Sequence, residues 1–285
     1  VPPQHPPAPA AAARQRANPS PKRGKKHLAL QRLNAANVHD DLSHPTREHA
    51  PLTLQQTMKK KTCVALTGAG ISADSGIPTF RGAGGLWEGH HVEDVATPEA
   101  FARNPQLVID FYNARRRQLL LVQPNAAHLA LAKLESAWNV HIVTQNVDNL
   151  HERAGSTQVL HLHGELTKLR STADARYVID WHQDQTLQDC DPQGFMLRPH
   201  IVWFGEAVPL IEEAAAWVEQ ADVVLVIGTS LKVYPAAGLL HYAPAHARIW
   251  LIDPHPAATL PGVQVIAERA SIGVAQVVQQ LLQEA

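Results

Sequence analysis

The sequence predicts an α/β protein built on a Rossmann-like, doubly wound parallel sheet with a smaller inserted lobe. From Thr62 onward, short β-branched apolar runs alternate with segments whose apolar residues recur at helical spacing. This alternation is typical of a parallel sheet covered by helices. In addition, each of four apolar runs ends in polar or glycine-rich residues. Ligands of open parallel sheets bind at such strand exits.

The expected elements follow this alternation. Two stretches, 83–124 and 164–199, interrupt it, and we expect them to form the smaller lobe with a cleft beside the sheet. The expected strands are 62–67, 140–143, 223–227 and 249–252, and the expected covering helices are 126–137, 210–220 and 271–282.

Charge divides the chain of 285 residues into two parts. Residues 1–61 carry 11 Lys and Arg against 3 Asp and Glu, whereas the remainder carries 14 against 23. The first 60 residues are rich in Pro and Ala and show little apolar periodicity, so we expect a disordered basic tail without a catalytic role. A basic tail could contact nucleic acid or acidic surfaces, but a solvated extension or leader is the favoured interpretation. Residues 61–285 are expected to fold.

Several features indicate the cellular setting. No run of 18 apolar residues occurs, and the start of the chain shows no apolar signal core. The two cysteines, Cys63 and Cys190, do not suggest a disulfide scaffold. We therefore expect a cytoplasmic protein, a monomer with neither a membrane partner nor a specific nucleic-acid partner.

A nucleotide site is suggested by the glycine-rich pattern Gly68-x-Gly70-x-x-Ala73 directly after the first expected strand. Such glycines let backbone amides and a helix start approach a pyrophosphate, although a glycine turn without a ligand remains an alternative. The chain does not continue as in a dehydrogenase, because Gly76 and Pro78 interrupt any helix there. Asp253 is a candidate for contacting the adenosine ribose, with a turn or helix-cap role equally open.

Four ordered segments resemble the signatures of the sirtuin family, class III, of bacterial type: 67–81, 144–151, 161–165 and 228–237. The resemblance covers essentially residues 62–285 and makes residues 61–285 the expected catalytic domain. It implies NAD-dependent removal of acyl groups from protein lysines. In that reaction NAD loses nicotinamide, the acyl oxygen attacks the ribose anomeric carbon, and O-acyl-ADP-ribose is released.

The resemblance also implies residue roles. His163 would be the general base, which suits an imidazole near neutral pH, although a lone histidine is more often structural. His161 is interpreted as structural. Asn146 and Asp148 would hold the nicotinamide carboxamide, and Gln145 would lie against its ribose. His163 and Asn146 are the expected catalytic residues. The expected NAD-binding residues are Gly68, Ala69, Gly70, Ser72, Ala73, Ile77, Phe80, Arg81, Trp87, Gln145, Asn146, Val147, Asp148, Gly228, Thr229, Ser230, Ile252, Asp253, Pro254 and Ala270.

The expected substrate is an acylated-lysine protein or peptide. Tyr112 and Arg115 stand three residues apart on one face of an expected helix and offer a hydroxyl and a guanidinium to one carboxylate. In the class that the chain resembles, such a pair reads succinyl or malonyl groups. The alternative is an ordinary basic helix face. The small residues 83–85 agree with a roomy acyl pocket. The segment expected to bind peptide as an added strand is Val202, Trp203, Phe204, Gly205 and Glu206.

The sequence departs from the family pattern in the smaller lobe. Many sirtuins hold a structural zinc there with four cysteines, but this lobe contains only Cys190, and Ser171 stands near another expected position. We predict no metal, with the lobe held by packing of Tyr177, Trp181 and Phe195. Recruitment of His182, Asp184 and Asp189 is the minor alternative. Competing functions are a mono-ADP-ribosyltransferase and a non-catalytic NAD-sensing protein.

Overall fold

The computed structural model describes residues 60–79, 86–87, 89–229, 236–256 and 261–284. These residues belong to one compact unit of the chain, Gln56–Ala285. The tail predicted over the first 60 residues lies outside the described residues except for its last position, and so do the small residues 83–85. None of the described helices combines the length and the apolar character needed to cross a membrane.

The main sheet has six strands in the order β11-β10-β9-β1-β4-β5, and each neighbouring pair is parallel. The predicted α/β class is confirmed. All four expected strands occur, and β5 and β11 are additional. The strands are β1 (Thr62–Thr67), β4 (Asn139–Thr144), β5 (Val159–His161), β9 (Val223–Ile227), β10 (Arg248–Ile252) and β11 (Val263–Ile266).

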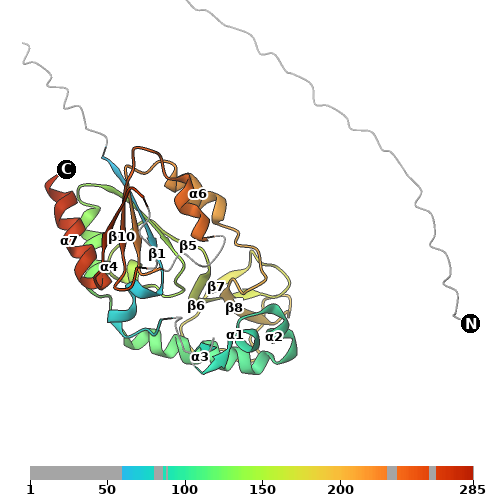
Figure 1. The fold of residues 1–285 in the computed structure, drawn as a ribbon. Helices are drawn as coiled ribbons and strands as arrows, with labels where there is room; N and C mark the ends of the chain where they lie inside the picture. Colours follow the sequence, from blue (N-terminus) through green and yellow to red (C-terminus); the bar gives the residue numbers. More distant parts are fainter. Residues whose placement is uncertain (1–59, 80–85, 88, 230–235, 257–260, 285) are drawn as a thin grey trace, which may run out of the picture. The chain divides into compact units, whose positions relative to one another are not determined.

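Helices cover both faces of this sheet (Figure 1). Helices α4 (Ala126–Leu134) and α7 (Ala270–Gln283) pack on one face, where Cys63 and Ala65 of β1 point. Helix α6 (Ile211–Val218) and the 3-10 helix η3 (Ala236–Tyr242) pack on the other, against Val64 and Leu66. A strand buried on both faces is apolar at every position, which explains the unbroken apolar runs in the sequence.

A second group of elements carries its own apolar core, which includes Phe101, Ile109, Leu166 and Trp203. Helices α2 and α3 both start with a side-chain cap followed by proline, Thr97-Pro98 and Asn104-Pro105. The elements are β2 (Leu86–Trp87), β3 (His90–His91), α1 (Val92–Val95), α2 (Pro98–Arg103), α3 (Pro105–Leu121), α5 (Leu150–Arg153) and the antiparallel strands β6 (Gly164–Ser171), β7 (Val178–Asp180) and β8 (Leu197–Ile201).

Hydrogen bonds hold an outer loop of this group around Ser171 and Asp191. The hydroxyl of Ser171 donates to Asp191 at 2.5 Å and accepts from the backbone N–H of Ala173 and Asp174. Phe195, which was expected to pack there, is 52% exposed, because its backbone is tied to Asp191 while its ring faces out. Across the described residues, no group of three or more His, Cys, Asp or Glu side chains is arranged to hold a metal ion.

Candidate active site

The site begins where the order of the sheet reverses, between β1 and β9. A Cβ atom on Gly70 would lie 2.6 Å from the Cα of Gly228, and one on Gly228 would lie 2.4 Å from the backbone nitrogen of Ile71. The amides of Gly68 and Gly70 donate to the carbonyls of Ile227 and Gly228. These glycines are therefore needed for two strand exits to touch, and their amides are used within the protein. The following residues form two short 3-10 turns, Ala69–Ile71 and Ala73–Ser75, instead of a helix.

A cavity of about 1120 Å³ opens at these strand exits and extends along the second group of elements to α3. It brings together most of the expected site residues that the structure describes. Ile252 is an exception, because its side chain is fully buried in the core. Phe80, Arg81 and Ser230 lie outside the described residues, and the side chain of Trp87 is not described. The expected residues that line the cavity are Gly68, Ala69, Gly70, Ser72, Ala73, Ile77, Tyr112, Arg115, Gln145, Asn146, Val147, Asp148, His163, Val202, Trp203, Phe204, Gly205, Glu206, Gly228, Thr229, Asp253, Pro254 and Ala270.

Other lining residues were missed by the sequence analysis. Gln118 stands three residues after Arg115 on α3, so the helical spacing that selected Arg115 also points to it. Most of the others are apolar or distant in sequence and offered no such signal. The missed residues are Asp74, Pro78, Thr79, Ala96, Gln118, Leu119, Leu166, Ile201, Val208, His255 and Arg269.

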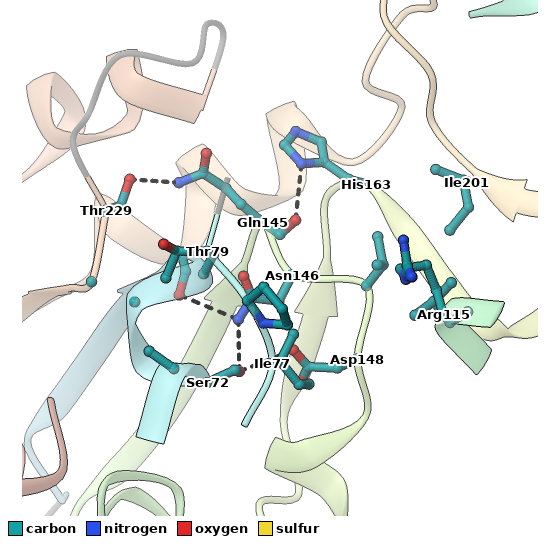
Figure 2. A pocket seen from close by; sticks show the side chains of 18 of the residues that line it. Ser72, Ile77, Thr79, Arg115, Gln145, Asn146, Asp148, His163, Ile201 and Thr229 are labelled. Carbon is teal, nitrogen blue, oxygen red and sulfur yellow. Dashed lines mark hydrogen bonds between the residues drawn. The ribbon is translucent and has the colours of Figure 1, made fainter. Parts of the chain in front are cut away.

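Asn146 is fixed from several sides at the exit of β4. Its side-chain Nδ2 donates to the carbonyl of Gly68 at 3.2 Å and to the hydroxyl of Ser72 at 3.1 Å. Because both acceptors engage the amide nitrogen, the amide oxygen is left to face other groups. Its backbone N–H donates to Thr144 Oγ1 at 3.0 Å. Figure 2 shows Asn146 beside Ser72, with a dashed line for the hydrogen bond between them.

Asp148 continues the same arrangement. The Ser72 hydroxyl donates to its Oδ2 at 3.0 Å, and the backbone N–H of Leu150 donates to its Oδ1 at 3.2 Å. Burial raises the pKa of Asp148, while these two hydrogen bonds and the charge of His161 act in the opposite direction. The amide oxygen of Asn146 and the carboxylate of Asp148 are both acceptors. This end of the cavity therefore suits a ligand group that donates hydrogen bonds.

His163 follows β5 and lies partly buried in the cavity wall. Its Nδ1 is 3.0 Å from the carbonyl oxygen of Gln145. A carbonyl oxygen only accepts, so Nδ1 carries the proton and Nε2 of the neutral ring is the basic nitrogen. Burial lowers the pKa of His163, and the hydrogen bond to Gln145 opposes this only in part. The hydrogen bond and the burial both favour a neutral imidazole whose Nε2 can accept a proton.

Helix α3 forms the opposite end of the cavity, where Tyr112 and Arg115 both line the wall. The Tyr112 hydroxyl accepts a hydrogen bond from the indole Nε1 of Trp203 at 2.9 Å, and the Arg115 guanidinium carbon lies 4.9 Å from the centre of the Phe111 ring. In the view of Figure 2, Arg115 and Thr229 lie at opposite sides with His163 and Asn146 between them.

The two arginines after Arg115 have different surroundings. Arg116 is 1% exposed and donates to the backbone carbonyls of Leu166 and Gln183 and to the side chain of Asn113. Arg117 is exposed and pairs with Asp184. Arg116 therefore links α3 to the antiparallel sheet, whereas Arg117 faces solvent.

The expected peptide-binding segment follows β8. Residues 202–206 form a turn, not a strand, which closes with a hydrogen bond from the amide of Glu206 to the carbonyl of Trp203. The Arg198 guanidinium lies 3.3 Å from the centre of the Trp203 ring and binds both carboxylate oxygens of Glu206. Partial burial alone would raise the pKa of Glu206, but the hydrogen bonds from Arg198 and Trp203 lower it overall. Glu206 therefore stiffens this turn.

At the sheet end of the cavity, Asp253 is 3% exposed and its Oδ1 accepts a hydrogen bond from the backbone N–H of His255 at 2.8 Å. This bond is the turn contact that was one of its two expected roles. Arg269, at the start of α7, lies 3.5 Å from Asp74, which also accepts from the Ser271 hydroxyl at 2.6 Å. These contacts join the start of α7 to the turn after β1.

A doubly wound parallel sheet with a cavity at its order reversal places this chain among the α/β proteins that bind a ligand at that point. Comparison with known sequences is more specific: the profile of the Sir2 family matches residues 68–235. The chain belongs to the Sir2 family, which confirms the resemblance to sirtuins.

Similar proteins support this assignment. The chain is 60% identical over 197 residues to a protein of Aggregatibacter actinomycetemcomitans named NAD-dependent protein deacylase, covering 69% of this chain and 95% of that protein. A protein of Bacteroides thetaiotaomicron with the same name is 55% identical over 230 residues, covering 78% and 98%. Among solved structures, a Sir2 homologue variant in complex with ADP-ribose has a TM-score of 0.73 at 40% identity, covering 79% of this chain and 93% of its own. A Sir2 homologue in complex with NAD has a TM-score of 0.70 at 39% identity, covering 79% and 91%.

Proposed function

We propose that this chain is an NAD-dependent protein-lysine deacylase that prefers succinyl and malonyl groups and also removes acetyl groups. The observation that carries the proposal is the single cavity lined by Asn146 and Asp148, by His163, and by Tyr112 and Arg115. The curated relatives named NAD-dependent protein deacylase support the NAD-dependent chemistry. The proposed acyl preference rests on Tyr112 and Arg115 of α3.

The residues at the strand exits fit NAD as a cosubstrate. Asn146 and Asp148 offer only acceptors, which matches the two N–H donors of a carboxamide. The hydroxyl of Thr229 accepts a hydrogen bond from the Gln145 side chain at 3.2 Å, and Thr229 and Asp253 both line the cavity. When bound, NAD supplies a glycosidic bond whose cleavage releases nicotinamide and makes the ribose carbon available to the acyl oxygen. With one water consumed, the products are the free lysine, nicotinamide and O-acyl-ADP-ribose.

His163 acts as the general base in this proposal. Its Nδ1 proton is held by the Gln145 carbonyl, so the ring keeps one tautomer and presents Nε2 to a ribose hydroxyl. The lowered pKa of His163 keeps the ring neutral at physiological pH. Gln145 links this base to the nucleotide side of the cavity, because its side chain binds Thr229 while its carbonyl binds the imidazole.

The acyl preference comes from Tyr112 and Arg115. Tyr112 and Arg115 both line the cavity, and the Arg115 guanidinium is a charged, planar donor suited to a carboxylate. A succinyl or malonyl carboxylate next to them gains charge-assisted hydrogen bonds, whereas an acetyl group gains none.

The peptide carrying the acyl-lysine would dock at the turn 202–206. We propose acylated-lysine proteins as the partners, with the chain acting as a cytoplasmic monomer without a specific nucleic-acid partner.

An assay of acetyl-, succinyl- and malonyl-lysine peptides with and without NAD tests the function. We expect NAD-dependent loss of the acyl mass, fastest for the acidic acyl groups, with release of nicotinamide. A gain of ADP-ribose mass on the peptide would instead indicate a mono-ADP-ribosyltransferase. NAD binding without nicotinamide release would indicate a non-catalytic sensor.

Replacing Arg115 with Met tests the acyl preference. Loss of the charge-assisted contact should lower kcat/KM for succinyl-lysine by roughly 10- to 100-fold, equivalent to about 1.5–3 kcal/mol. The effect on acetyl-lysine should be much smaller, because acetyl carries no carboxylate.

Arg117→Met is the matched control, because Arg117 lies two residues away on the same helix but faces solvent. It should leave both activities close to those of the unchanged chain. An equal loss on succinyl- and acetyl-lysine in Arg115→Met would show that Arg115 does not select the acyl group.

A further inference from the structure

Behind the turn that carries Asn146 lies a second histidine that the proposed reaction does not use. His161 ends β5 and is 8% exposed. Its Nδ1 is 3.0 Å from the carbonyl oxygen of Asn146, and its Nε2 is 2.8 Å from Oε1 of Glu152 on α5. His161 and His163 thus contact the consecutive carbonyls of Asn146 and Gln145, but only His163 lines the cavity.

The hydrogen-bond partners determine the protonation state of His161. The Asn146 carbonyl can only accept, and an ionised carboxylate can only accept, so both ring nitrogens must donate. A neutral imidazole has a single N–H and cannot satisfy both contacts. The remaining possibility is a protonated Glu152, but the side chain of Glu152 is 40% exposed and next to the charge of Lys168, which favours the carboxylate.

We propose that His161 is an imidazolium paired with Glu152, and that this charged pair positions the turn from Asn146 to Asp148 for the donor group of the ligand. The inference rests on the proposed NAD-binding function. His161 is a positioning residue, because it acts through the Asn146 backbone and does not line the cavity. The charge strengthens its hydrogen bond to Asn146 and favours the carboxylate of Asp148, which is buried close to it.

The surrounding charges agree with this assignment. Burial alone would lower the pKa of His161, but the hydrogen bond and charge of Glu152, the charge of Glu165 and the Asn146 carbonyl together raise it. Lys168, which pairs with Glu165, faces Glu152 from β6.

Two other histidines lie nearby. His151, on α5, and His128, on α4, both have pKa values lowered by burial, so they stay neutral where His161 is charged. Of these three histidines, His161 is thus the one whose pKa is raised above the usual histidine value.

Nitrogen NMR of the wild-type chain tests the charge directly. With histidine side chains labelled with 15N, the His161 resonances, assigned by their absence in His161→Gln, should show both nitrogens protonated at pH 7. In Glu152→Gln, the amide replaces the carboxylate and can donate to Nε2, so His161 should become neutral with its proton on Nδ1. A neutral His161 in the wild-type chain would overturn the proposal without any assay of activity.

Calorimetry with NAD tests the positioning. For the wild-type chain, NAD affinity should fall several-fold as the pH rises from 7 through the raised pKa of His161. Glu152→Gln should bind NAD several-fold more weakly at pH 7 and lose this pH dependence, with KM for NAD changed more than kcat. Asp94→Asn, at an exposed pair with Arg103, is the matched carboxylate-to-amide control and should bind as the wild type does.

The two possible failures are distinguishable. A wild-type chain that binds no NAD would refute the proposed function. A wild-type chain that binds NAD with the same affinity and pH dependence as Glu152→Gln would overturn the positioning role of His161 alone.

Discussion

The two histidines of the sequence His161-Leu162-His163 have the same side chain but different surroundings. Each places its Nδ1 3.0 Å from a backbone carbonyl of the turn after β4. They differ at the other end of the ring. Nε2 of His161 contacts the Glu152 carboxylate, whereas the ring of His163 lines the cavity. In our two proposals, the neighbouring acceptors make His161 the cation and His163 the base.

Replacing His163 with Ala should lower kcat for deacylation by roughly 100-fold or more, which is the usual contribution of a general base. NAD affinity should change little, because the Asn146 amide is held by Gly68 and Ser72 and not by His163. His246→Ala, at an exposed histidine, is the control. A His163→Ala chain that retains activity would remove His163 from the mechanism.

The pH profile of the unchanged chain provides a second measurement of the same group. The base must be neutral, and burial lowers the pKa of His163, so the neutral form persists below the usual histidine pKa of about 6.5. The acid limb of kcat/KM should therefore lie below pH ~6.5. An acid limb above pH 7 would contradict this assignment.

At the scale of elements, the exits of β1 and β9 are in direct contact through glycine. Gly70→Ala would place a methyl group 2.6 Å from the Cα of Gly228, so one backbone must move. We expect a loss of about 1–3 kcal/mol in the free energy of unfolding, the usual cost of overpacking, together with weaker NAD binding.

The matched control is Gly238→Ala in η3, because a Cβ there would meet no heavy atom within 4 Å. Chemical denaturation of both variants provides the comparison. Equal stability of the two variants would show that the strand exits accommodate the methyl group.

The sequence predicted some of these elements much better than others, for physical reasons. Strands β1 and β9 are buried on both faces and read as continuous apolar runs, so their limits were predicted to the residue. Strand β5 has only three residues, Val159–His161, and gives no such run. The polar and glycine-rich residues at the four strand exits marked the place of the cavity, but the pattern did not reveal how closely the backbone at Gly228 approaches Gly70.

Among the residues that line the cavity, those that the sequence indicated mostly stand in short motifs. Asn146, Asp148 and His163 stand in such motifs, whereas Arg269 comes from the start of α7, far along the chain, and no local pattern indicates it. Ile252 was expected at the cavity with Asp253, but it is not among the lining residues, and its side chain packs in the core.

For the whole molecule, buried histidines should make stability depend on pH. His128 and His151 are both fully buried, their rings are 4.9 Å apart, and His128 Nε2 and His151 Nδ1 have no hydrogen-bond partner among the described residues. Burial lowers the pKa of His128 to about 4 and that of His151 well below its usual value.

The sign follows from proton binding. Between pH ~6.5 and ~4 the unfolded chain binds protons on these two rings that the folded chain does not, so the free energy of unfolding falls as the pH decreases. At pH 5, His128 alone should lower the free energy of unfolding by about 2 kcal/mol. The raised pKa of His161 acts oppositely: its contribution is fully present below pH ~6.5 and is lost as the pH rises through the folded-state pKa.

Urea denaturation at pH 7 and pH 5 measures this dependence. His128→Gln should show a smaller difference between the two pH values than the unchanged chain, whatever its stability at pH 7. His246→Gln, at an exposed histidine, should retain the full difference. Identical differences in all three chains would show that His128 is not the group that titrates.

The hydrogen bond between Trp203 and Tyr112 joins two parts of the cavity with different tasks. The indole belongs to the turn proposed to receive the peptide, and the phenol belongs to the helix proposed to select the acyl group. Altering one therefore shifts the other. A variant redesigned for a different acyl group would therefore also change its peptide preference, because acyl and peptide recognition share one buried hydrogen bond.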